Sequence, residues 1–471
     1  MDYLSTRGRA PELPFDEVVL TGLAADGGLY VPRRYPTVGP KEIAAFAGRP
    51  YAETAEILIQ PFAEGLPAAL LRQAASGAYA TFSHAAVAPL TQIADNLFVL
   101  ELFHGPTLAF KDLAMQLLGR LMDALLEKRG LRATIVGATS GDTGAAAIEA
   151  FRGRANVDVF ILYPDGRVSD VQRRQMTTVA DENVHAIALD GSFDDAQTLL
   201  KGLFRDEAFR SGVGLAGVNS INWARVVAQM VYYFTSAVAL GAPYRKVSFA
   251  VPTGNFGDVL AGYVAKRMGL PIERLIVATN ENDILARALA TGRYEPRDVR
   301  PTQSPSMDIQ LSSNFERLLF DAVGRDPESV RSAFESLERE GAFEIPPAAL
   351  KRVRENFDAL AVNEAETRAE IARTWRESGY VIDPHTATGV RAARARLEKD
   401  PATPVIALST AHPAKFPEAI ERAIGLRVEP PPRLAPVLQG REKLARMKKD
   451  AEAVKRFILD HARAARVAAG A

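Results

Sequence analysis

The middle and C-terminal parts of the chain contain short, unbroken apolar runs bounded by polar or glycine-containing turns. Their length and β-branched content predict buried strands at ATIVGAT (133–139), VDVFILYP (157–164), NVHAIALD (183–190), KVSFAVPT (246–253), RLIVATN (274–280) and TPVIALST (403–410). Longer helical patterns lie between several of them, such as DLAMQLLGRLMDALLEKR (112–129), DVQRRQMTTVA (170–180) and DVLAGYVAKRM (258–268). Unbroken strands that alternate with helices predict parallel sheets covered on both faces, so the expected fold class is α/β.

The two ends of the chain have a different pattern. In the first ninety or so residues, polar turns such as ADGGLYVPRRYP (25–36) interrupt helical segments, while residues 323–380 are mostly charged and helical around an IPPAAL turn at 345–350. The proline cluster EPPPRLAP (429–436) precedes a final helix that we predict from about Arg441 to Val467, packed by Leu444, Val454 and Ile458. We expect an N-terminal unit at 1–95, a small α/β domain at 96–235, a large α/β domain at 236–430 and a C-terminal helical tail at 431–471.

Composition and charge narrow the function. The 471 residues include 57 Lys plus Arg and 57 Asp plus Glu, so the formal net charge is zero and favours neither nucleic acid nor an anionic membrane. We therefore expect a small-molecule substrate. The absence of cysteine excludes disulfides, thiolate metal sites and a cysteine nucleophile. The N-terminus shows no apolar run of signal-peptide length and no segment resembles a membrane span, so a cytoplasmic location is expected.

Two predicted strand-to-helix loops could bind an anion. The first loop contains Ser140, Gly141, Asp142 and Thr143 and leads into an alanine-rich helix. Free backbone N–H groups and the helix dipole attract a carboxylate or phosphate at such a place. The alternative is a plain turn in which Ser140 or Asp142 caps the helix.

The second loop has two glycines that let the backbone approach a phosphate closely. Its residues are Thr253, Gly254, Asn255, Phe256 and Gly257. Neither loop has the spacing of a P-loop or of a dinucleotide-binding fold, which disfavours a nucleotide cofactor.

A third stretch, NSINWARVVAQ (219–229), places Asn219, Ser220 and Arg225 near the start of a helix. A guanidinium beside amide and hydroxyl donors suits a phosphate ester, because its fork geometry binds two oxygens at once. An N-cap pair followed by one exposed arginine explains the same residues.

A single lysine, Lys111, lies within HGPTLAFKDLAMQ (104–116) at a predicted helix start. By position alone it is an ordinary solvated lysine, although a cation there faces the unfavourable end of the helix dipole. The histidines show no HxH or HExxH spacing and no GxSxG elbow appears, so neither a metal site nor a serine hydrolase is expected.

A lysine, a glycine loop and a polar loop together are typical of pyridoxal-phosphate chemistry, in which a lysine amine forms an imine with the cofactor aldehyde. The chain also resembles the threonine synthases of the bacterial and fungal branch, within the fold type II pyridoxal-phosphate enzymes. The resemblance spans YLSTRG (3–8), LTGLAADGGLYVP (20–32), ELFHGPTLAFKD (101–112), GATSGDTGAAA (137–147), VNSINWARVVAQ (218–229), VPTGNFGD (251–258), SPSMDIQLSSNFERLLF (304–320) and STAHPAKFPEAI (409–420). It implies two parallel-sheet α/β domains flanking a cofactor cleft.

The resemblance also implies a role for each candidate residue. Lys111 would bind the cofactor covalently and shuttle protons. Thr253, Gly254, Asn255, Phe256 and Gly257 would hold the cofactor phosphate, and Thr410 would lie by the pyridine nitrogen, with Ser409 as the neighbouring alternative. Ser140, Gly141 and Thr143 would bind the substrate, and Asp142 would approach the cofactor hydroxyl. Many relatives have asparagine where this chain has Asp142, and an anion cannot donate as asparagine does.

The implied reaction converts O-phospho-L-homoserine and water into L-threonine and phosphate, with Asn219, Ser220 and Arg225 holding the substrate phosphate. Alternatives are another fold type II lyase, such as a threonine or serine dehydratase, and a non-catalytic ligand-binding relative. His104, Asp308 and Lys415 lie in matching motifs without an assigned role. We expect a monomer, with a dimer as the alternative.

Overall fold

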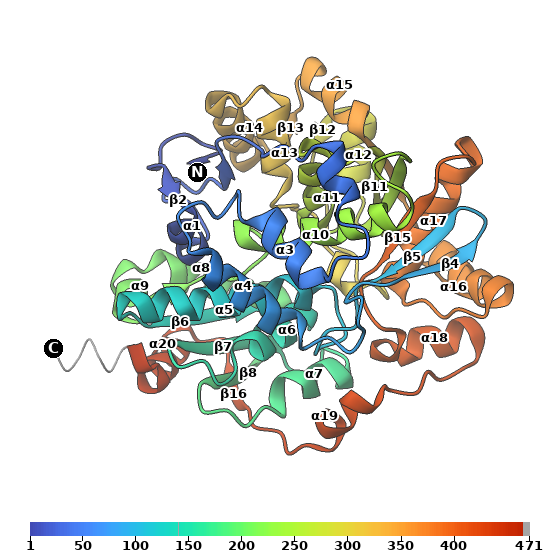
Figure 1. The fold of residues 1–471 in the computed structure, drawn as a ribbon. Helices are drawn as coiled ribbons and strands as arrows, with labels where there is room; N and C mark the ends of the chain where they lie inside the picture. The colour runs from blue at the N-terminus through green and yellow to red at the C-terminus, as the bar shows by residue number, and fades with distance from the viewer. Residues whose placement is uncertain (140, 465–471) are drawn as a thin grey trace.

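The structure, a computed structural model, describes residues 1–139 and 141–464, and Figure 1 traces the chain. The N-terminal unit is mainly helical and carries a small antiparallel sheet in the order β2-β1-β3. Its elements are β1 (Asp2–Ser5), β2 (Leu13–Pro14), α1 (Phe15–Thr21), β3 (Tyr30–Pro32), α2 (Pro40–Ala44), α3 (Tyr51–Ile59) and α4 (Ala68–Tyr79). The Tyr3 ring lies 6.0 Å from that of Phe15 and 6.1 Å from that of Trp223, which begins α10 (Trp223–Ala239). The unit therefore shares its core with the rest of the molecule.

Among the described residues, the larger sheet has six strands in the order β14-β11-β10-β15-β5-β4. The strands are β4 (Leu90–Ala94), β5 (Leu97–Glu101), β10 (Val247–Pro252), β11 (Ile272–Thr279), β14 (Phe357–Ala361) and β15 (Val405–Ser409). Only the edge strand β4 runs antiparallel to its neighbour in this part of the chain. Every residue of β10 and β15 is buried, as expected for a parallel sheet covered on both faces.

The second sheet has five strands within the described residues, in the order β16-β8-β7-β6-β9, and all of them are parallel. The strands are β6 (Ala133–Ala138), β7 (Val157–Pro164), β8 (Val184–Asp190), β9 (Leu215–Ala216) and β16 (Ala445–Lys448). In β7, Val159 and Ile161 join one apolar core, while Phe160 and Leu162 join another. Alternate residues of a strand point to opposite faces, so this sheet is also covered on both sides.

Helices connect the strands and cover the sheets. Those of the first half are α5 (Lys111–Arg129), α6 (Asp142–Phe151), α7 (Asp170–Thr177), α8 (Phe193–Arg205), α9 (Glu207–Gly212) and α10. The later helices are α11 (Gly257–Arg267), α12 (Ile284–Thr291), α13 (Phe315–Ala322), α14 (Pro327–Glu340), α15 (Pro347–Asn356), α16 (Glu364–Ser378), α17 (Pro384–Lys399), α18 (Pro417–Ile424), α19 (Ala435–Gln439) and α20 (Ala451–His461). A two-stranded ribbon pairs β12 (Arg293–Tyr294) with β13 (Phe343–Glu344). Among the residues described, no helix has the length and apolar character needed to cross a bilayer.

The α/β fold class and the strands predicted from unbroken apolar runs are confirmed. The prediction of one long helix from Arg441 to Val467 is wrong over its described part. Instead, β16 pairs with β8 and α20 follows from Ala451 to His461, while residues 465–467 lie outside the described residues. The sequence ARMK lies on a sheet edge, and its residues alternate between half-buried and exposed. Four residues are too few to distinguish this two-residue period from the period of a helix.

The strands β4, β5 and β14 were not expected. Figure 1 shows β4 and β5 beside β15, far from β6 to β8. Each sheet therefore takes one or more strands from outside its main stretch of sequence. The strand β5 comes before the five-stranded sheet in sequence but pairs with β15 in the six-stranded sheet. The strand β16 comes after the strands of the six-stranded sheet but pairs with β8 in the five-stranded sheet. The four predicted domain ranges stay a prediction.

Candidate active site

Lys111 begins α5 and is 8% exposed. Its Nζ donates to Ser306 Oγ at 3.4 Å and lies 3.8 Å from a carboxylate oxygen of Asp142. Burial lowers the pKa of Lys111 to about 8, with Asp142 opposing the shift and nearby cations adding to it. At this pKa a substantial fraction of the amine is neutral near neutral pH, whereas an ordinary surface lysine is almost entirely protonated.

The segment before Lys111 is attached to the end of β15. The backbone N–H of Phe110 donates to the carbonyl of Thr410 at 2.8 Å, and Ala109 forms a bridge with Ala411. The Lys111 ammonium also lies 5.1 Å from the centre of the Phe110 ring. Lys111 is therefore positioned from the end of β15 in the six-stranded sheet, although its helix packs against α4, α6 and α10.

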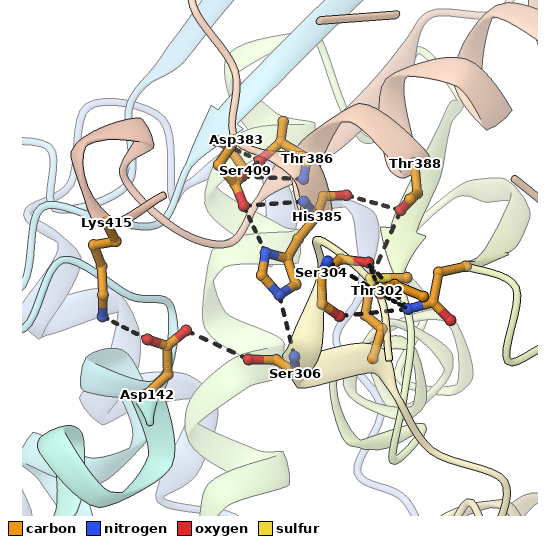
Figure 2. Close-up of polar contacts among 12 residues, drawn as sticks. Asp142, Thr302, Ser304, Ser306, Asp383, His385, Thr386, Thr388, Ser409 and Lys415 are labelled. Atoms are coloured by element: carbon orange, nitrogen blue, oxygen red, sulfur yellow. Dashed lines mark hydrogen bonds and ion pairs between the residues drawn. The ribbon is translucent and has the colours of Figure 1, made fainter. Parts of the chain in front are cut away.

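Asp142, the first residue of α6, is buried in an ion pair. Its Oδ1 lies 2.6 Å from Lys415 Nζ and accepts from Gln172 Nε2 at 2.9 Å. Burial by itself would raise the pKa of this carboxyl, but the ammonium groups of Lys415 and Lys111 hold it well below its usual range. Figure 2 shows Lys415 pointing at Asp142, and Asp142 facing Ser306, whose Oγ donates to Oδ2 at 3.5 Å.

Ser306 connects this pair to a buried histidine. Its backbone N–H donates to His385 Nε2 at 3.3 Å, and the other ring nitrogen lies 2.6 Å from Asp383 Oδ2. Because Nε2 accepts, the imidazole donates from Nδ1 to the carboxylate. Asp383 also caps α17, accepting from the backbone N–H of His385 at 3.0 Å and of Thr386 at 3.0 Å. Figure 2 displays this chain of contacts from Asp383 to Lys415.

The turn from β6 to α6 is held by a hydroxyl that the sequence did not single out. Thr139 Oγ1 accepts from the backbone N–H of Gly141 at 3.0 Å and of Gly144 at 2.9 Å. Gly141 has φ 140, and a Cβ there would lie 2.4 Å from Gln172 Cδ. Thr143 is half-buried beside this turn, and Ser140 lies outside the described residues.

The turn from β10 to α11 is built from backbone. Phe256 is its N-cap with φ 63, and in the described part of the chain no cap side chain bonds to this helix terminus. A Cβ on Gly254 would lie 2.9 Å from the carbonyl oxygen of Ser306. Ser312 Oγ donates to the carbonyl of Gly254 at 2.7 Å, and Thr253 Oγ1 donates to the carbonyl of Val251 at 2.6 Å. The first N–H groups of α11 are left for a ligand or water.

The third candidate stretch reaches the same place through Asn314. Asn314 donates its backbone N–H to the carbonyl of Asn255 at 3.1 Å and its side-chain amide to the carbonyl of Ser220 at 3.0 Å. Asn222, rather than Asn219 or Ser220, caps α10 with its side chain, and Asn219 is exposed. Ser220 thus lies beside the glycine loop, which the sequence alone did not show.

Arg225, in the first turn of α10, is 4% exposed, so the interpretation as an exposed arginine is wrong. Its Nη1 donates to the carbonyl of Val218 at 3.2 Å, whereas its buried Nε has no partner among the described residues. Burial lowers its pKa to about 10, which leaves the guanidinium charged at neutral pH. The charge also contributes to lowering the pKa of Lys111, so the two groups belong to one electrostatic cluster.

At the end of β15, Ser409 and Thr410 differ in their surroundings. Ser409 Oγ lies 3.0 Å from Thr386 Oγ1, so this hydroxyl belongs to the Asp383 network. Thr410 is 5% exposed and follows the last strand residue, with its carbonyl bound to Phe110 as described above. The pairing of Ser409 leaves Thr410 as the stronger candidate to face a bound ring.

The structure also defines residues for which sequence reasoning had no role. Asp308 accepts four hydrogen bonds, from Asn280 and Asn282 side chains and from both N–H and hydroxyl of Thr302, so it organises the 302–308 loop that carries Ser306. His104 lies 2.6 Å from Glu101 Oε2 through its Nε2. Ser306 stands in the quoted SPSMD motif, which was the available signal, whereas the contact of Gln172 with Asp142 depends on folding alone.

The geometry agrees with comparisons to known proteins. Family models match the chain as "Threonine synthase N terminus" over residues 2–79, as "Pyridoxal-phosphate dependent enzyme" over 85–343 and as "Threonine synthase, C-terminal" over 386–458. The chain is 51% identical over 463 residues to a threonine synthase of Pseudomonas aeruginosa, covering 98% of each. The chain belongs to the threonine synthase family.

Solved structures of the threonine synthase family extend this result. A pyridoxal-phosphate-bound threonine synthase from Brucella melitensis has a TM-score of 0.95 and 54% identity, covering 98% of this chain and 100% of that one. Threonine synthase from yeast has a TM-score of 0.92 and 40% identity, covering 98% of each chain. The predicted fold class, enzyme class and pyridoxal-phosphate dependence are thereby confirmed.

The residues fit the cofactor of the threonine synthase family on physical grounds. Lys111 offers a buried amine whose pKa is lowered, as attack on an aldehyde requires. The uncapped N-terminus of α11, approached by Gly254, suits a phosphate group. The buried Nε of Arg225, which has no partner within residues 1–139 and 141–464, could bind a second anion. The individual roles of these residues stay predictions.

Proposed function

We propose that the enzyme converts O-phospho-L-homoserine and water into L-threonine and phosphate. Beyond family membership, support comes from Arg225, a buried guanidinium beside Lys111 with an Nε that lacks a partner among the described residues. A buried cation without a counter-ion is costly unless a ligand supplies the anion. The substrate phosphate would supply it, and charge would grow there as the bond to Cγ breaks.

Cofactor binding is assigned to the backbone-built turn. In this proposal Lys111 attaches pyridoxal phosphate, and Thr253, Gly254, Asn255, Phe256 and Gly257 hold its phosphate at the N-terminus of α11. When bound, the cofactor stabilises negative charge that develops at the substrate Cα. Thr410 would place a neutral hydroxyl near the pyridine nitrogen. A hydroxyl stabilises a protonated ring less than a carboxylate does, so the ring would withdraw less charge, which suits elimination and replacement over transamination.

Lys111 is the proton carrier in this proposal. Its amine would take the proton from Cα and pass it on before it takes a proton from Cβ as phosphate leaves from Cγ. A proton would then be delivered to Cγ, water would add its hydroxyl at Cβ, and a proton would return to Cα, so that no proton is left over. A pKa of about 8 serves both directions of transfer near neutral pH. Asp142 approaches the cofactor hydroxyl as an acceptor that keeps its own charge.

The turn from β6 to α6 would bind the substrate carboxylate. Support comes from its position at the N-terminus of α6, where Thr143 is half-buried and Asp142 lies 3.8 Å from the Lys111 amine. Ser140 is included from its motif alone. Ser220 and the exposed Asn219 complete the assignment of the phosphate region with Arg225.

Phosphate release decides the substrate. The purified holoenzyme should release phosphate from O-phospho-L-homoserine and form threonine, while serine, threonine and O-acetylserine should turn over at least a hundredfold more slowly. Turnover of only the latter group would contradict the proposal and indicate a dehydratase or a related lyase. Borohydride reduction and peptide mapping should place the pyridoxyl group on Lys111, and Lys111→Ala should lose that adduct and all turnover.

Arg225 supplies the discriminating variant. Arg225→Ala should lower kcat/KM for the phosphorylated substrate, because it removes about 2–4 kcal/mol of transition-state stabilisation. The matched control is Arg427→Ala, which removes an arginine from an ion pair whose two side chains are 76% and 48% exposed and should change nothing. Equal kinetics in both variants would exclude Arg225 from the phosphate site.

Two further features belong to this proposal. A monomer is expected, with a dimer as the alternative, and light scattering of the full chain distinguishes them. The cysteine-free composition suits a reducing, cytoplasmic compartment, which fractionation of the source cells tests.

A further inference from the structure

Lys415 is a fully buried lysine to which family resemblance gave no role. It ends the short helix η2 (Pro413–Lys415) that follows β15, and its exposed fraction is 0%. Its Nζ lies 2.6 Å from Asp142 Oδ1 and donates to the carbonyl of Thr107 at 2.9 Å. An ammonium this deeply buried must be compensated, and both of these contacts are to the segments that surround Lys111.

The charges around Lys111 make the arrangement specific. The groups that face its amine are the carboxylates of Asp142 and Asp112 and the cations of Lys415 and Arg225. Asp112 is occupied by Thr107, which donates its N–H and its hydroxyl to it at 2.8 Å each. Asp142 is therefore the carboxylate with an oxygen, Oδ2, turned toward Lys111.

We propose that Lys415 is a positioning residue that acts as the fixed counter-ion of Asp142 and thereby releases Lys111 from pairing with that carboxylate. This inference rests on the proposed function, because the proposed function assigns proton transfer to the Lys111 amine. Asp142 stays charged without needing the proton of Lys111, so the amine can be neutral while the buried cluster remains electrically balanced. An asparagine at position 142 would need no such counter-ion. The buried charges of Asp142 and Lys415 are therefore explained together, as one ion pair.

Geometry fixes the pair in one orientation. Gln172 donates to the same oxygen of Asp142 that Lys415 contacts, which directs Oδ2 toward Ser306 and Lys111. The Thr107 carbonyl takes a second donor, Gln175 Nε2, at 2.9 Å. Lys415 thus joins the chain after β15 to the turn before α5 and to the first turn of α6.

The test measures the titration of Lys111 directly. The full-length protein, freed of cofactor, is acetylated with a trace of acetic anhydride at a series of pH values, and mass spectrometry quantifies the peptide that carries Lys111. Lys415→Met should raise the titration midpoint by about 1–3 pH units, because Lys111 is then the remaining cation that pairs with Asp142 among the described residues. Asp142→Asn alone should lower the midpoint, and Asp142→Asn with Lys415→Met should return it to within about one unit of the native value.

The holoenzyme gives a second readout. The acidic limb of its pH–kcat profile should shift upward in Lys415→Met and return in the double variant. Arg394→Met is the matched control, since Arg394 is 9% exposed and pairs with Glu370 at 2.8 Å between α16 and α17. It breaks a buried ion pair elsewhere and should leave the Lys111 midpoint unchanged.

Each outcome decides a stated point. An unchanged Lys111 midpoint in Lys415→Met, or a shift equal to that of Arg394→Met, would overturn the inference and leave Lys415 with a purely structural role. If Lys415→Met does not fold, Asp142→Asn decides by sign, because a raised or constant midpoint contradicts the inference. The acetylation result does not depend on turnover, so failure of the proposed substrate would leave it intact.

Discussion

The turns from β6 to α6 and from β10 to α11 share a topology but satisfy their helix termini by different means. At α6 a hydroxyl, Thr139, takes two backbone N–H groups, and a buried carboxylate, Asp142, opens the helix. At α11 the cap is Phe256, with left-handed backbone, and no carboxylate contact closes the turn in the described residues. The first turn is thus set by side chains and charge, the second by backbone shape. The contrast teaches that the helix N-terminus of a strand-loop-helix unit can carry a side-chain carboxylate or can leave room for an anionic ligand.

The largest expected effect is in the α6 turn. Gly141→Ala adds a Cβ that would lie 2.4 Å from Gln172 Cδ at a residue with φ 140. Backbone strain and overpacking together should cost about 3–5 kcal/mol of unfolding free energy. Urea denaturation measures the loss. Gly202→Ala is the control, since none of the residues that the structure describes comes within 4 Å of its added Cβ in α8. A comparable loss there would contradict the local explanation.

Asp258 in α11 and Asp142 in α6 should affect the pH dependence of stability in opposite ways. Burial raises the pKa of Asp258, in the first turn of α11, to about 6, although Tyr232 and Tyr233 donate to it. A raised acid pKa stabilises the fold below the unfolded value and loses that contribution as pH rises through the folded value. Between about pH 4 and 6 the native protein should lose about 3 kcal/mol more stability than Asp258→Asn.

Denaturation of both proteins at each pH tests the sign. Asp142 should behave in the opposite way, because its lowered pKa gives stability that is present above its unfolded pKa and lost as pH falls below it. Parallel stability curves for the native protein and Asp258→Asn would show that this carboxyl is charged in the folded state.

The hydroxyl of the α6 turn should matter more than its counterpart before α11. Thr139→Val leaves the N–H groups of Gly141 and Gly144 without their acceptor in a buried place, at a cost of about 2 kcal/mol. Thr253→Val removes only a donor to the carbonyl of Val251 and should cost about 1 kcal/mol. Thermal or urea unfolding compares them, and equal losses would remove the distinction between the turns.

The smallest effect concerns the backbone-built turn. Gly254→Ala adds a Cβ that would lie 2.9 Å from the Ser306 carbonyl oxygen and 3.0 Å from Ile309 Cδ1, so the 305–309 segment that carries Ser306 must shift. Cofactor affinity should fall roughly tenfold, which corresponds to about 1.4 kcal/mol, and the forced shift should cost about 1 kcal/mol of unfolding free energy. Titration of the apoprotein with pyridoxal phosphate, followed by fluorescence, measures it. Unchanged affinity would argue against this turn as the phosphate site.

The six predicted strands were recognisable because they are wholly or mostly buried and therefore read as continuous apolar runs. The exceptions have physical reasons. The strand β16 is short and lies at an edge, and β14 follows a helix directly, with Phe357 serving both as the C-cap of α15 and as the first strand residue. The pairing of β5 with β15 joins residues about three hundred positions apart, which no local pattern encodes.

The candidate residues were found as separate motifs, and folding decided how they meet. Local chemistry and family resemblance identified Lys111, Asp142, Arg225 and the Gly254 loop. The ion pair of Asp142 with Lys415, and the contacts of Ser306 with Lys111 and Gly254, join residues from distant segments. Asn219 shows the reverse, since its motif position suggested a donor but its side chain is exposed.

The sequence by itself determined the fold class and the cofactor chemistry and singled out Lys111 as the candidate lysine, because unbroken apolar strands and ordered motifs are local properties of the chain. Only the tertiary structure decided the charge state that this lysine can adopt. The pKa of an amine depends on burial and on every charge within a few ångströms, and here those charges come from helices α5, α6 and α10 and from the segment after β15.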